Sequence, residues 1–377
     1  MYFKEQRYEK AKASTLASTH TVALPDTGML DSLSMYFRVT NAASMSGVGP
    51  TNIHHYITKI EVIGDNDKTI FSLTGEEALA KAYRKMGALP PFMQNEYQGK
   101  SQDLLIPIFF GRKYKDGKYA LDLSKWDKVE LKVTNTETTS LITAGSLSME
   151  TRLCTIEDSV ETHAKFLKQW EYEAEKPAAA ASYIRPKLPT KGLLRSLMIQ
   201  LDPDLTALTA QMTNTPTGDS YNWKLWFKDR ALTIYDHRVK DLFRDEHRRL
   251  GIGHSSLKPY PSTTKYCDYH WAYVQSVAIA GLMDTADATQ PSTEDSSDRF
   301  QKLGYAGAVT MLQAHVHGIG LFHTFEIPFY LPQDEEVNYL NLDTYKQVEI
   351  EWYAVNADHT HRIILEKPIG QGPTEFA

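Results

Sequence analysis

Among the residues of this 377-residue chain, His315 and His317 are the most suggestive of chemistry because a single residue separates them. On a β-strand, side chains at positions i and i+2 point to the same side, so both imidazoles could reach one ion. His323 and Glu326 follow, and a carboxylate could complete the ligand set of a transition metal. The pattern therefore raises a metal-dependent enzyme as one hypothesis.

The histidine pair is similar to the His-x-His motif of the cupins, a family of jelly-roll enzymes in which a glutamate follows more closely. Glu326 lies nine residues after His317, since 326 − 317 = 9, and the glycine pattern of that motif is absent. We therefore predict no metal site, no cofactor and no catalytic residue. We expect these histidines at a subunit contact or satisfied in packing. His315 and His317 remain the candidate ligands of the alternative, a bicupin-type metal-dependent enzyme.

Other polar patterns give less reason to expect catalysis. His54 and His55 are adjacent, and on a strand they would face opposite sides and could not share an ion. The stretch from Asp358 to His361 is typical of a turn before the last strand. The chain contains no Gly-x-Ser-x-Gly elbow, no phosphate loop and no dinucleotide fingerprint. We therefore favour a function that does not depend on catalysis.

An internal repeat indicates which elements position these residues. Residues 24–30, LPDTGML, return as residues 188–194, LPTKGLL, at an offset of 188 − 24 = 164. The triplet TIF that starts at Thr69 returns as TIY at Thr233, and 233 − 69 is again 164. A repeat of this length exceeds the roughly 20–50 residues of solenoid units, so each copy is expected to be a complete domain with its own core.

A third match has another offset and indicates an insertion. Residues 106–110, IPIFF, match residues 327–331, IPFYL. The gap after Gly87 is 106 − 87 = 19, the gap after Gly251 is 327 − 251 = 76, and the second copy therefore has 76 − 19 = 57 additional residues within 252–326. The last part of the insertion before residue 300 is too polar to bury, which predicts an exposed tower loop. That loop contains Asp284, Pro291, Glu294, Asp295 and Asp298.

The coarse pattern of both copies is that of short strands. Apolar and polar residues alternate over 33–39, and two apolar runs at 57–63 and 68–73 flank a Gly-Asp-Asn-Asp turn. The period then changes to that of a helix ending at Gly87, with a counterpart ending at Gly251. The chain is therefore predicted to be all-β, with two tandem β-sandwiches that each contain a short helix.

The segment between the two copies is predicted to be a linker. Phe166, Leu167 and Trp170 would lie on one side of a polar helix over 159–176, and a Pro-Ala-Ala-Ala-Ala stretch follows. We therefore divide the chain into an N-terminal arm (1–20), a first sandwich (21–158), a helical and Ala/Pro-rich linker (159–187), a second sandwich (188–370) and a C-terminal tail (371–377).

Charge and cysteine content argue against two classes of function. With 41 Lys and Arg against 47 Asp and Glu, the net charge of −6 gives no electrostatic reason to expect tight nucleic-acid binding. Cys154 and Cys267 fall at unmatched positions of the two copies, so neither a disulfide framework nor a thiolate metal site is suggested.

The N-terminal arm combines basic and aromatic side chains. One interpretation is a solvated terminus, and the other is a contact with a membrane surface or a neighbouring subunit. The residues that would make this contact are Tyr2, Phe3, Lys4, Arg7, Lys10 and Lys12.

Two consecutive β-sandwich copies, each with a helix after its early strands, resemble the double jelly-roll major capsid proteins of tailless icosahedral viruses, the lineage that includes the adenovirus hexon. This family has no diagnostic short motif, so the resemblance rests on the arrangement of the elements. It is carried by residues 60–87, 106–112, 119–123 and 128–133 and by their second-copy partners 225–251, 327–331 and 339–352.

The resemblance implies two jelly rolls per chain and a homotrimer whose six rolls give a nearly hexagonal footprint that tiles an icosahedral capsid. It implies a virion protein, assembled in the host cytoplasm or nucleus, with penton and minor capsid proteins as partners. In family members with an internal membrane, the N-terminal arm lies on the inner side. A chain of two similar domains suits this role because three subunits then present six similar edges.

Two other functions remain open at the level of the sequence. The first is the bicupin-type enzyme, which stoichiometric iron, manganese or zinc would favour. The second is a two-domain carbohydrate-binding surface protein that reads sugars with the tower loop, which glycan binding by a monomer would favour. A stable trimer would favour the capsid protein.

Overall fold

The chain folds mainly into β-strands. The computed structural model describes residues 2–13, 17–42, 52–95, 99–136, 142–143, 145–157, 163–175, 182–203, 222–227, 231–258, 266–268, 271–283, 300–302, 309–330, 335–345, 347–354 and 359–376. Strands dominate this part of the chain, and three α-helices accompany them, which confirms the prediction of an all-β protein. No helix in the described ranges is both long and apolar enough to span a bilayer.

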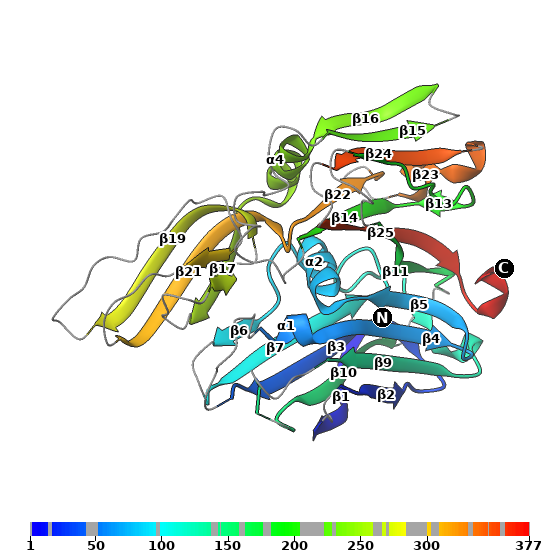
Figure 1. Cartoon of the computed structure of the whole chain (residues 1–377). Coiled ribbons are helices and arrows are strands. Elements are labelled where there is room, and N and C mark those ends of the chain that lie inside the picture. The colour runs from blue at the N-terminus through cyan, green and yellow to red at the C-terminus, as the bar shows by residue number, and fades with distance from the viewer. Residues whose placement is uncertain are drawn as a thin grey trace.

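The first sandwich packs two four-stranded layers against each other (Figure 1). One layer has the strand order β1-β10-β3-β7 and the other has the order β2-β9-β4-β5. Leu33 of β3 and Ile60 of β4 are fully buried in the core that the two layers share. The strands are β1 (Tyr2–Ala13), β2 (Thr19–Ala23), β3 (Met29–Thr40), β4 (Ile57–Gly64), β5 (Lys68–Leu73), β7 (Ser101–Phe109), β9 (Val129–Asn135) and β10 (Ser148–Glu157).

The second sandwich repeats this arrangement with its own core. Its layers have the orders β11-β25-β14-β22 and β12-β24-β15-β16, and Leu197 and Trp352 are buried between them. The two copies therefore form two tandem jelly rolls, as the resemblance implies. The strands are β11 (Lys165–Glu175), β12 (Ser182–Ile184), β14 (Ser196–Pro203), β15 (Asn222–Phe227), β16 (Leu232–Arg238), β22 (Thr324–Pro328), β24 (Val348–Ala354) and β25 (His359–Gly370).

The copies match down to the register of their shortest strands. Met29 lies opposite Asp122 in the first copy, and Leu193 lies opposite Asn341 in the second. The first offset, 193 − 29 = 164, is that of the repeat before the insertion. The second, 341 − 122 = 219, is two residues short of the 327 − 106 = 221 found just after the insertion. The elements concerned are β8 (Leu121–Asp122), β13 (Leu193–Leu194), β23 (Leu340–Asn341) and the 3-10 helices η1 (Leu123–Lys125) and η4 (Leu342–Thr344), and two further turns form η3 (Glu336–Asn338) and η5 (Pro373–Phe376).

Each copy contains one helix of 12 residues, α2 (Gly75–Met86) and α4 (Val239–Leu250), again 239 − 75 = 164 residues apart. Thr74 and Glu77 form a capping box in which each side chain accepts a hydrogen bond from the backbone N–H of the other, and this box starts α2. Both helices end at a glycine with positive φ, as predicted, although only Gly87 has the left-handed helical conformation, with φ 71° and ψ 7°. Gly251 has φ 75° and ψ −165°.

The segment between α4 and β22 contains the additional strands of the second copy. The antiparallel strands β19 and β21 are 13 residues long each and extend away from both sandwiches (Figure 1). At the corresponding place, the described part of the first copy has the short strand β6 (Phe92–Asn95). The additional strands are β17 (Gly253–Lys258), β18 (Tyr266–Asp268), β19 (Trp271–Met283), β20 (Phe300–Lys302) and β21 (Val309–Leu321). The predicted tower loop with Asp284, Pro291, Glu294, Asp295 and Asp298 lies outside the described residues.

The predicted helix in the linker is wrong, because its described part is strand β11. This strand pairs with β25 on one side and with β5 on the other, so its backbone groups are satisfied by a sheet. It is the second-copy equivalent of β1, since each of the two pairs with the last strand of its own sandwich. The apolar spacing of Phe166, Leu167 and Trp170 also suits a helix, but strand pairing overrides that local pattern. The alanine stretch that follows lies outside the described residues.

The prediction that residues 1–20 stand apart from the first sandwich is also wrong for Tyr2–Ala13. These residues form β1, which pairs with β10 at the edge of its sheet. Most of its side chains are exposed on both faces, so the sequence lacks the alternation that marks a half-buried strand. Residues 2–13 therefore form a strand because they pair with β10, and their hydrophobic pattern does not reveal this.

The two helix-ending glycines are expected to respond differently to asparagine. Gly87→Asn should leave the melting temperature nearly unchanged because asparagine tolerates the left-handed helical conformation. Gly251→Asn should lower stability by about 1–3 kcal/mol because its ψ lies in a region that only glycine populates readily. Gly87→Val should lower stability by about 1–2 kcal/mol. Thermal denaturation of the three variants tests this, and equal melting temperatures for the two asparagine variants would contradict it.

Candidate functional site

The two sandwiches are joined edge to edge by strand pairing. β5 of the first and β11 of the second pair in parallel, with Gln169 opposite Phe71 and Trp170 opposite Ser72. β6 and β17 also pair in parallel, with Leu257 opposite Gln94. Two sheets therefore continue from one copy into the other. Backbone hydrogen bonds at two places constrain how the sandwiches are oriented, which a free linker could not do.

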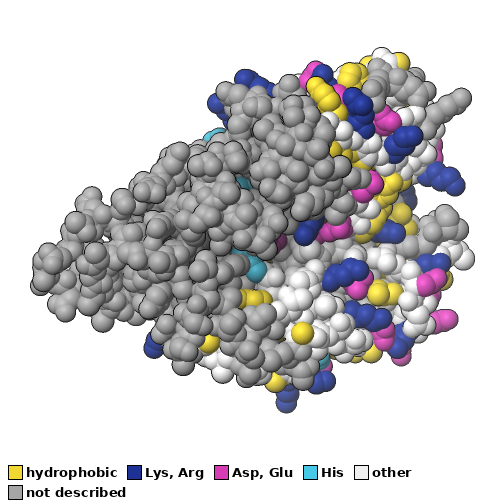
Figure 2. All heavy atoms as spheres, viewed as in Figure 1, with side chains coloured by type: hydrophobic (Ala, Val, Ile, Leu, Met, Phe, Trp, Pro, Cys, Tyr) yellow, Lys and Arg dark blue, Asp and Glu magenta, His cyan; other side chains and the backbone are white. Residues whose placement is uncertain are grey.

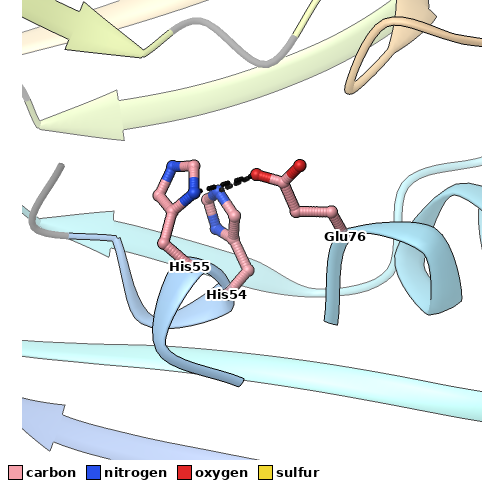
Figure 3. Close-up of side chains that lie close together, drawn as sticks. All are labelled: His54, His55 and Glu76. Atoms are coloured by element: carbon pink, nitrogen blue, oxygen red, sulfur yellow. Dashed lines mark ion pairs between the residues drawn. The ribbon is translucent and has the colours of Figure 1, made fainter. Parts of the chain in front are cut away.

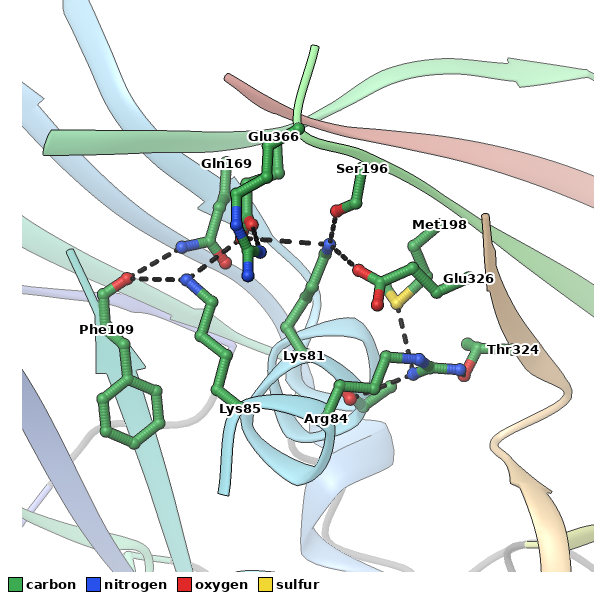
Figure 4. Close-up of polar contacts among 12 residues, drawn as sticks. Lys81, Arg84, Lys85, Phe109, Gln169, Ser196, Met198, Thr324, Glu326 and Glu366 are labelled. Carbon is green, nitrogen blue, oxygen red and sulfur yellow. Dashed lines mark hydrogen bonds and ion pairs between the residues drawn. The ribbon is translucent and has the colours of Figure 1, made fainter. Parts of the chain in front are cut away.

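Helix α2 lies at this junction and directs three basic side chains into it (Figure 4). Lys81, Arg84 and Lys85 are spaced at i, i+3 and i+4, so they share one helical face. Their side chains are only 3%, 3% and 4% exposed. Three buried cations on one short helix require partners, because an unpaired buried charge is costly.

The first partner is Glu326 on β22 of the second sandwich. Lys81 Nζ donates to Glu326 Oε1 at 2.7 Å and to Ser196 Oγ at 2.9 Å (Figure 4). Arg249 of α4 adds a second cation, with Nη1 3.7 Å from Glu326 Oε2. These contacts lower the pKa of Glu326: burial alone would raise it, but the charges of Lys81 and Arg249 outweigh that effect.

Glu366 on β25 is the second partner, and its side chain is fully buried. Lys85 Nζ lies 3.0 Å from Glu366 Oε2, and the guanidinium of Arg195 pairs with the other carboxylate oxygen. Burial alone would raise the pKa of Glu366, but the charges of Lys85, Lys81 and Arg195 lower it to about 2. Lys85 also donates to the carbonyl oxygen of Gly111 at 2.7 Å, so it contacts both sandwiches.

The third partner is Glu246 on α4, the helix equivalent to α2. Arg84 Nη2 donates to both carboxylate oxygens of Glu246, at 2.8 and 2.9 Å, and to Thr324 Oγ1 at 2.8 Å. Glu246 in turn accepts the backbone N–H of Glu326 at 3.1 Å. We call the resulting cluster the α2 charge network; it comprises Lys81, Arg84, Lys85, Glu246, Glu326 and Glu366.

Sequence reasoning did not find this network. The sequence feature that could have indicated it is the basic triplet Lys81, Arg84 and Lys85, which has the spacing of one helical face. Ala78 and Ala82 lie beside this triplet, and such small residues let a helix pack closely. Its partners Glu246, Glu326 and Glu366 come from three separate elements of the other copy, and no sequence spacing connects them. The network therefore depends on tertiary structure.

Among the described residues, His315 and His317, the candidate ligands of the enzyme alternative, do not meet a third ligand to form a metal site. Both lie on β21, where His254 of β17 is opposite His317, with ring centroids 4.9 Å apart. Glu326 belongs to the α2 charge network instead, and His323 is buried in the turn that precedes β22. Burial lowers the pKa of His254, and the neighbouring His317 and His315 lower it further.

His54 and His55, which were predicted unable to share an ion, do converge. They lie on a short helix, α1 (Ile53–Tyr56), and not on a strand, so their side chains are not on opposite sides. Both face Glu76 in the first turn of α2, as Figure 3 shows. His55 Nδ1 lies 2.9 Å and His54 Nε2 3.7 Å from Glu76 Oε1. Within the described residues, this is the one group of three or more His, Cys, Asp or Glu residues whose ligand atoms all lie within 4.8 Å of one another.

The basic and aromatic residues of the predicted arm lie along edge strand β1. Arg7 pairs with Glu150 on β10, and the Arg7 Nη2–Glu150 Oε2 distance is 3.0 Å. Tyr2 and Tyr8 are among the exposed large hydrophobic residues, at 54% and 39%.

Cys154 on β10 is a free thiol, and burial raises its pKa to about 11.

Comparisons with known proteins identify the fold family that the structure resembles. No protein-family model matches the chain, and no curated protein matches its sequence. The crystal structure of the Sulfolobus turreted icosahedral virus major capsid protein is similar over 97% of this chain and 96% of its own, with TM-score 0.60 and 9% identity. The PBCV-1 virus capsid model is similar over 98% and 93%, with TM-score 0.57 and 8% identity.

A third solved structure extends this likeness to a bacterial virus. The major capsid protein P2 from bacteriophage PM2 is similar over 98% of this chain and 97% of its own, with TM-score 0.52 and 10% identity. In all three comparisons the match includes both sandwiches. The chain therefore has the double jelly-roll fold of these viral capsid proteins.

Removing one cation from the α2 charge network should be strongly destabilising. Lys81→Met leaves Glu326 without its closest cation in a buried site, and we expect a loss of about 3–5 kcal/mol. The control is Lys59→Met, which breaks a Lys–Glu pair at 2.8 Å whose lysine is 53% exposed; exposed pairs contribute about 0–1 kcal/mol. Chemical denaturation of both variants measures the difference, and similar losses would contradict the assignment.

The depressed pKa of Glu366 predicts a pH dependence. A carboxylate whose pKa is lowered on folding stabilises the protein above its unfolded pKa of about 4.5, and this contribution disappears as pH falls toward about 2. Glu366→Gln should therefore melt well below the wild type at pH 7, and the gap should narrow as pH falls through this window. Melting temperatures measured from pH 7 to pH 2.5 test this, and a constant gap would contradict it.

Proposed function

We propose that this chain is a structural major capsid protein that forms pseudo-hexagonal homotrimers tiling the shell of an icosahedral virion. The observation that carries the proposal is the extent of the likeness. It covers 97% of this chain and 96% of the Sulfolobus turreted icosahedral virus major capsid protein, so it includes both sandwiches and the junction between them. A likeness confined to one sandwich would be compatible with many unrelated functions.

The junction supports this function on physical grounds. Six rolls from three chains form a regular outline only if the two rolls of each chain keep a constant orientation. Two sheets that continue across the junction and the α2 charge network provide that constraint. The strands β17, β19 and β21 make the two rolls unequal, as expected if they form a tower or a clasp on a neighbouring subunit.

The described surface suits contacts between many copies. In Figure 2, basic and acidic side chains are interspersed over the described part of that face. Mixed charges of both signs favour contacts that are specific and reversible. The chain carries a net charge of −6, which gives no electrostatic reason to expect that it condenses a genome.

Strand β1 is our candidate for a contact with a neighbouring subunit or an internal membrane. It lies at the end of its sheet, and an edge strand offers unpaired backbone groups to a partner. Besides neighbouring trimers, we propose penton and minor capsid proteins as partners, with assembly in the host cytoplasm or nucleus. The side chains proposed to make the β1 contact are Tyr2, Phe3, Lys4, Arg7, Lys10 and Lys12.

Sedimentation equilibrium of the purified chain tests the proposal. A shell subunit of this type should give a concentration-independent mass of 3 × 42.8 = 128.4 kDa. Electron microscopy of the same sample should show particles with a six-cornered outline. A monomer of 42.8 kDa at every concentration would contradict the proposal, and so would a dimer.

A further inference from the structure

We propose that His54, His55 and Glu76 bind one divalent transition-metal ion, with zinc as the best fit, and that this ion fastens α1 to α2 beside the junction of the sandwiches. Figure 3 shows both imidazoles directed at the same end of the Glu76 side chain. The inference does not depend on the proposed shell function, because it concerns only ligands within one chain.

The distances suit a tetrahedral ion. With metal–ligand bonds of about 2.1 Å, the ligand atoms of a tetrahedron lie about 3.4 Å apart. The observed separations from Glu76 Oε1, 2.9 Å to His55 Nδ1 and 3.7 Å to His54 Nε2, lie on either side of that value. The two imidazole nitrogens lie within 4.8 Å of each other, so a modest convergence of the three side chains would admit an ion.

The surroundings hold the ligands in place. The His54 ring packs against Phe322 and Phe92, with centroid distances of 4.9 and 5.5 Å. Gln200 of the second sandwich donates to Glu76 Oε2 at 2.9 Å, which orients the carboxylate and leaves Oε1 toward the histidines. Outer partners of this kind tune the affinity of metal sites.

Gly75 allows the close approach of the two helices. A side chain at this position would place its Cβ 2.8 Å from the backbone oxygen of His54 and 3.1 Å from Ile57 Cβ. The second copy has Val239 and Lys240 at the positions of Gly75 and Glu76, since 75 + 164 = 239 and 76 + 164 = 240. The site is therefore specific to the first copy and is not a general requirement of the jelly roll.

The ligand set determines the class of metal. Two imidazole nitrogens and one carboxylate oxygen suit zinc and its transition-metal neighbours, whereas calcium and magnesium prefer oxygen ligands. The three protein ligands leave a fourth position for water. The histidine side chains are 0% and 8% exposed and that of Glu76 is 12% exposed, so the ion would be largely shielded from solvent. This burial suits a stabilising role.

The test is titration of the chelator-treated 377-residue chain with Zn²⁺ by calorimetry, together with Co²⁺ absorption and melting temperatures. We expect one zinc per chain, a higher melting temperature with zinc, and the visible bands of tetrahedral cobalt. Magnesium should produce none of these effects. Gln200→Leu should weaken zinc binding by about 10–100-fold.

Matched variants locate the ion. His55→Ala and Glu76→Gln should each abolish the stoichiometric binding, while His317→Ala, which alters the histidines of β17 and β21, should retain it. Circular dichroism confirms that each variant is folded before the titration. Binding that is lost in His317→Ala and kept in His55→Ala would overturn the proposal, and so would a wild-type protein that binds no zinc.

Discussion

The arrangement of this molecule depends on the burial of three cations from one helix among carboxylates of the opposite domain. Lys81, Arg84 and Lys85 leave the first sandwich and end at Glu326, Glu246 and Glu366 of the second. Separating the sandwiches would leave these charges without their partners. Such pairs contribute little net stability compared with apolar packing, but they penalise every other arrangement of the two domains. The network therefore specifies one orientation.

Strand pairing and the charge network act on the same junction. The parallel pairs β5–β11 and β6–β17 align the sheets, and the buried charges prevent sliding of one sandwich along the other. The helix equivalent to α2 repeats this role only in part, because α4 has Arg249 where α2 has Lys85 but Asp245 where α2 has Lys81, as 85 + 164 = 249 and 81 + 164 = 245. Two copies of one domain have thus diverged: the first supplies Lys81, Arg84 and Lys85, and the second supplies all three carboxylates together with Arg195 and Arg249. The shell subunit that we propose would need such a constant shape.

The repeat made most of the fold predictable, because an offset of 164 residues before the insertion and of 219 to 221 residues after it carries over to helices, turns and register. The sequence-based prediction was wrong where pairing with another strand determines the secondary structure. The apolar spacing of β11 suits a helix, and β1 has no buried face that would mark it as a strand. His54 and His55 were assumed to lie on a strand, whereas they lie on a four-residue helix that brings both side chains to Glu76. The charge network could not be predicted, because Glu246, Glu326 and Glu366 converge only in three dimensions.

A double-mutant cycle between Lys81 and Glu326 tests most directly whether buried charge holds the two sandwiches together. Lys81→Met and Glu326→Leu each leave a buried charge without its closest partner, whereas the double variant removes both charges. If buried charge holds the sandwiches together, the double variant should be more stable than the sum of the two single losses implies, by about 2 kcal/mol or more. Losses that are small and add without coupling would contradict it.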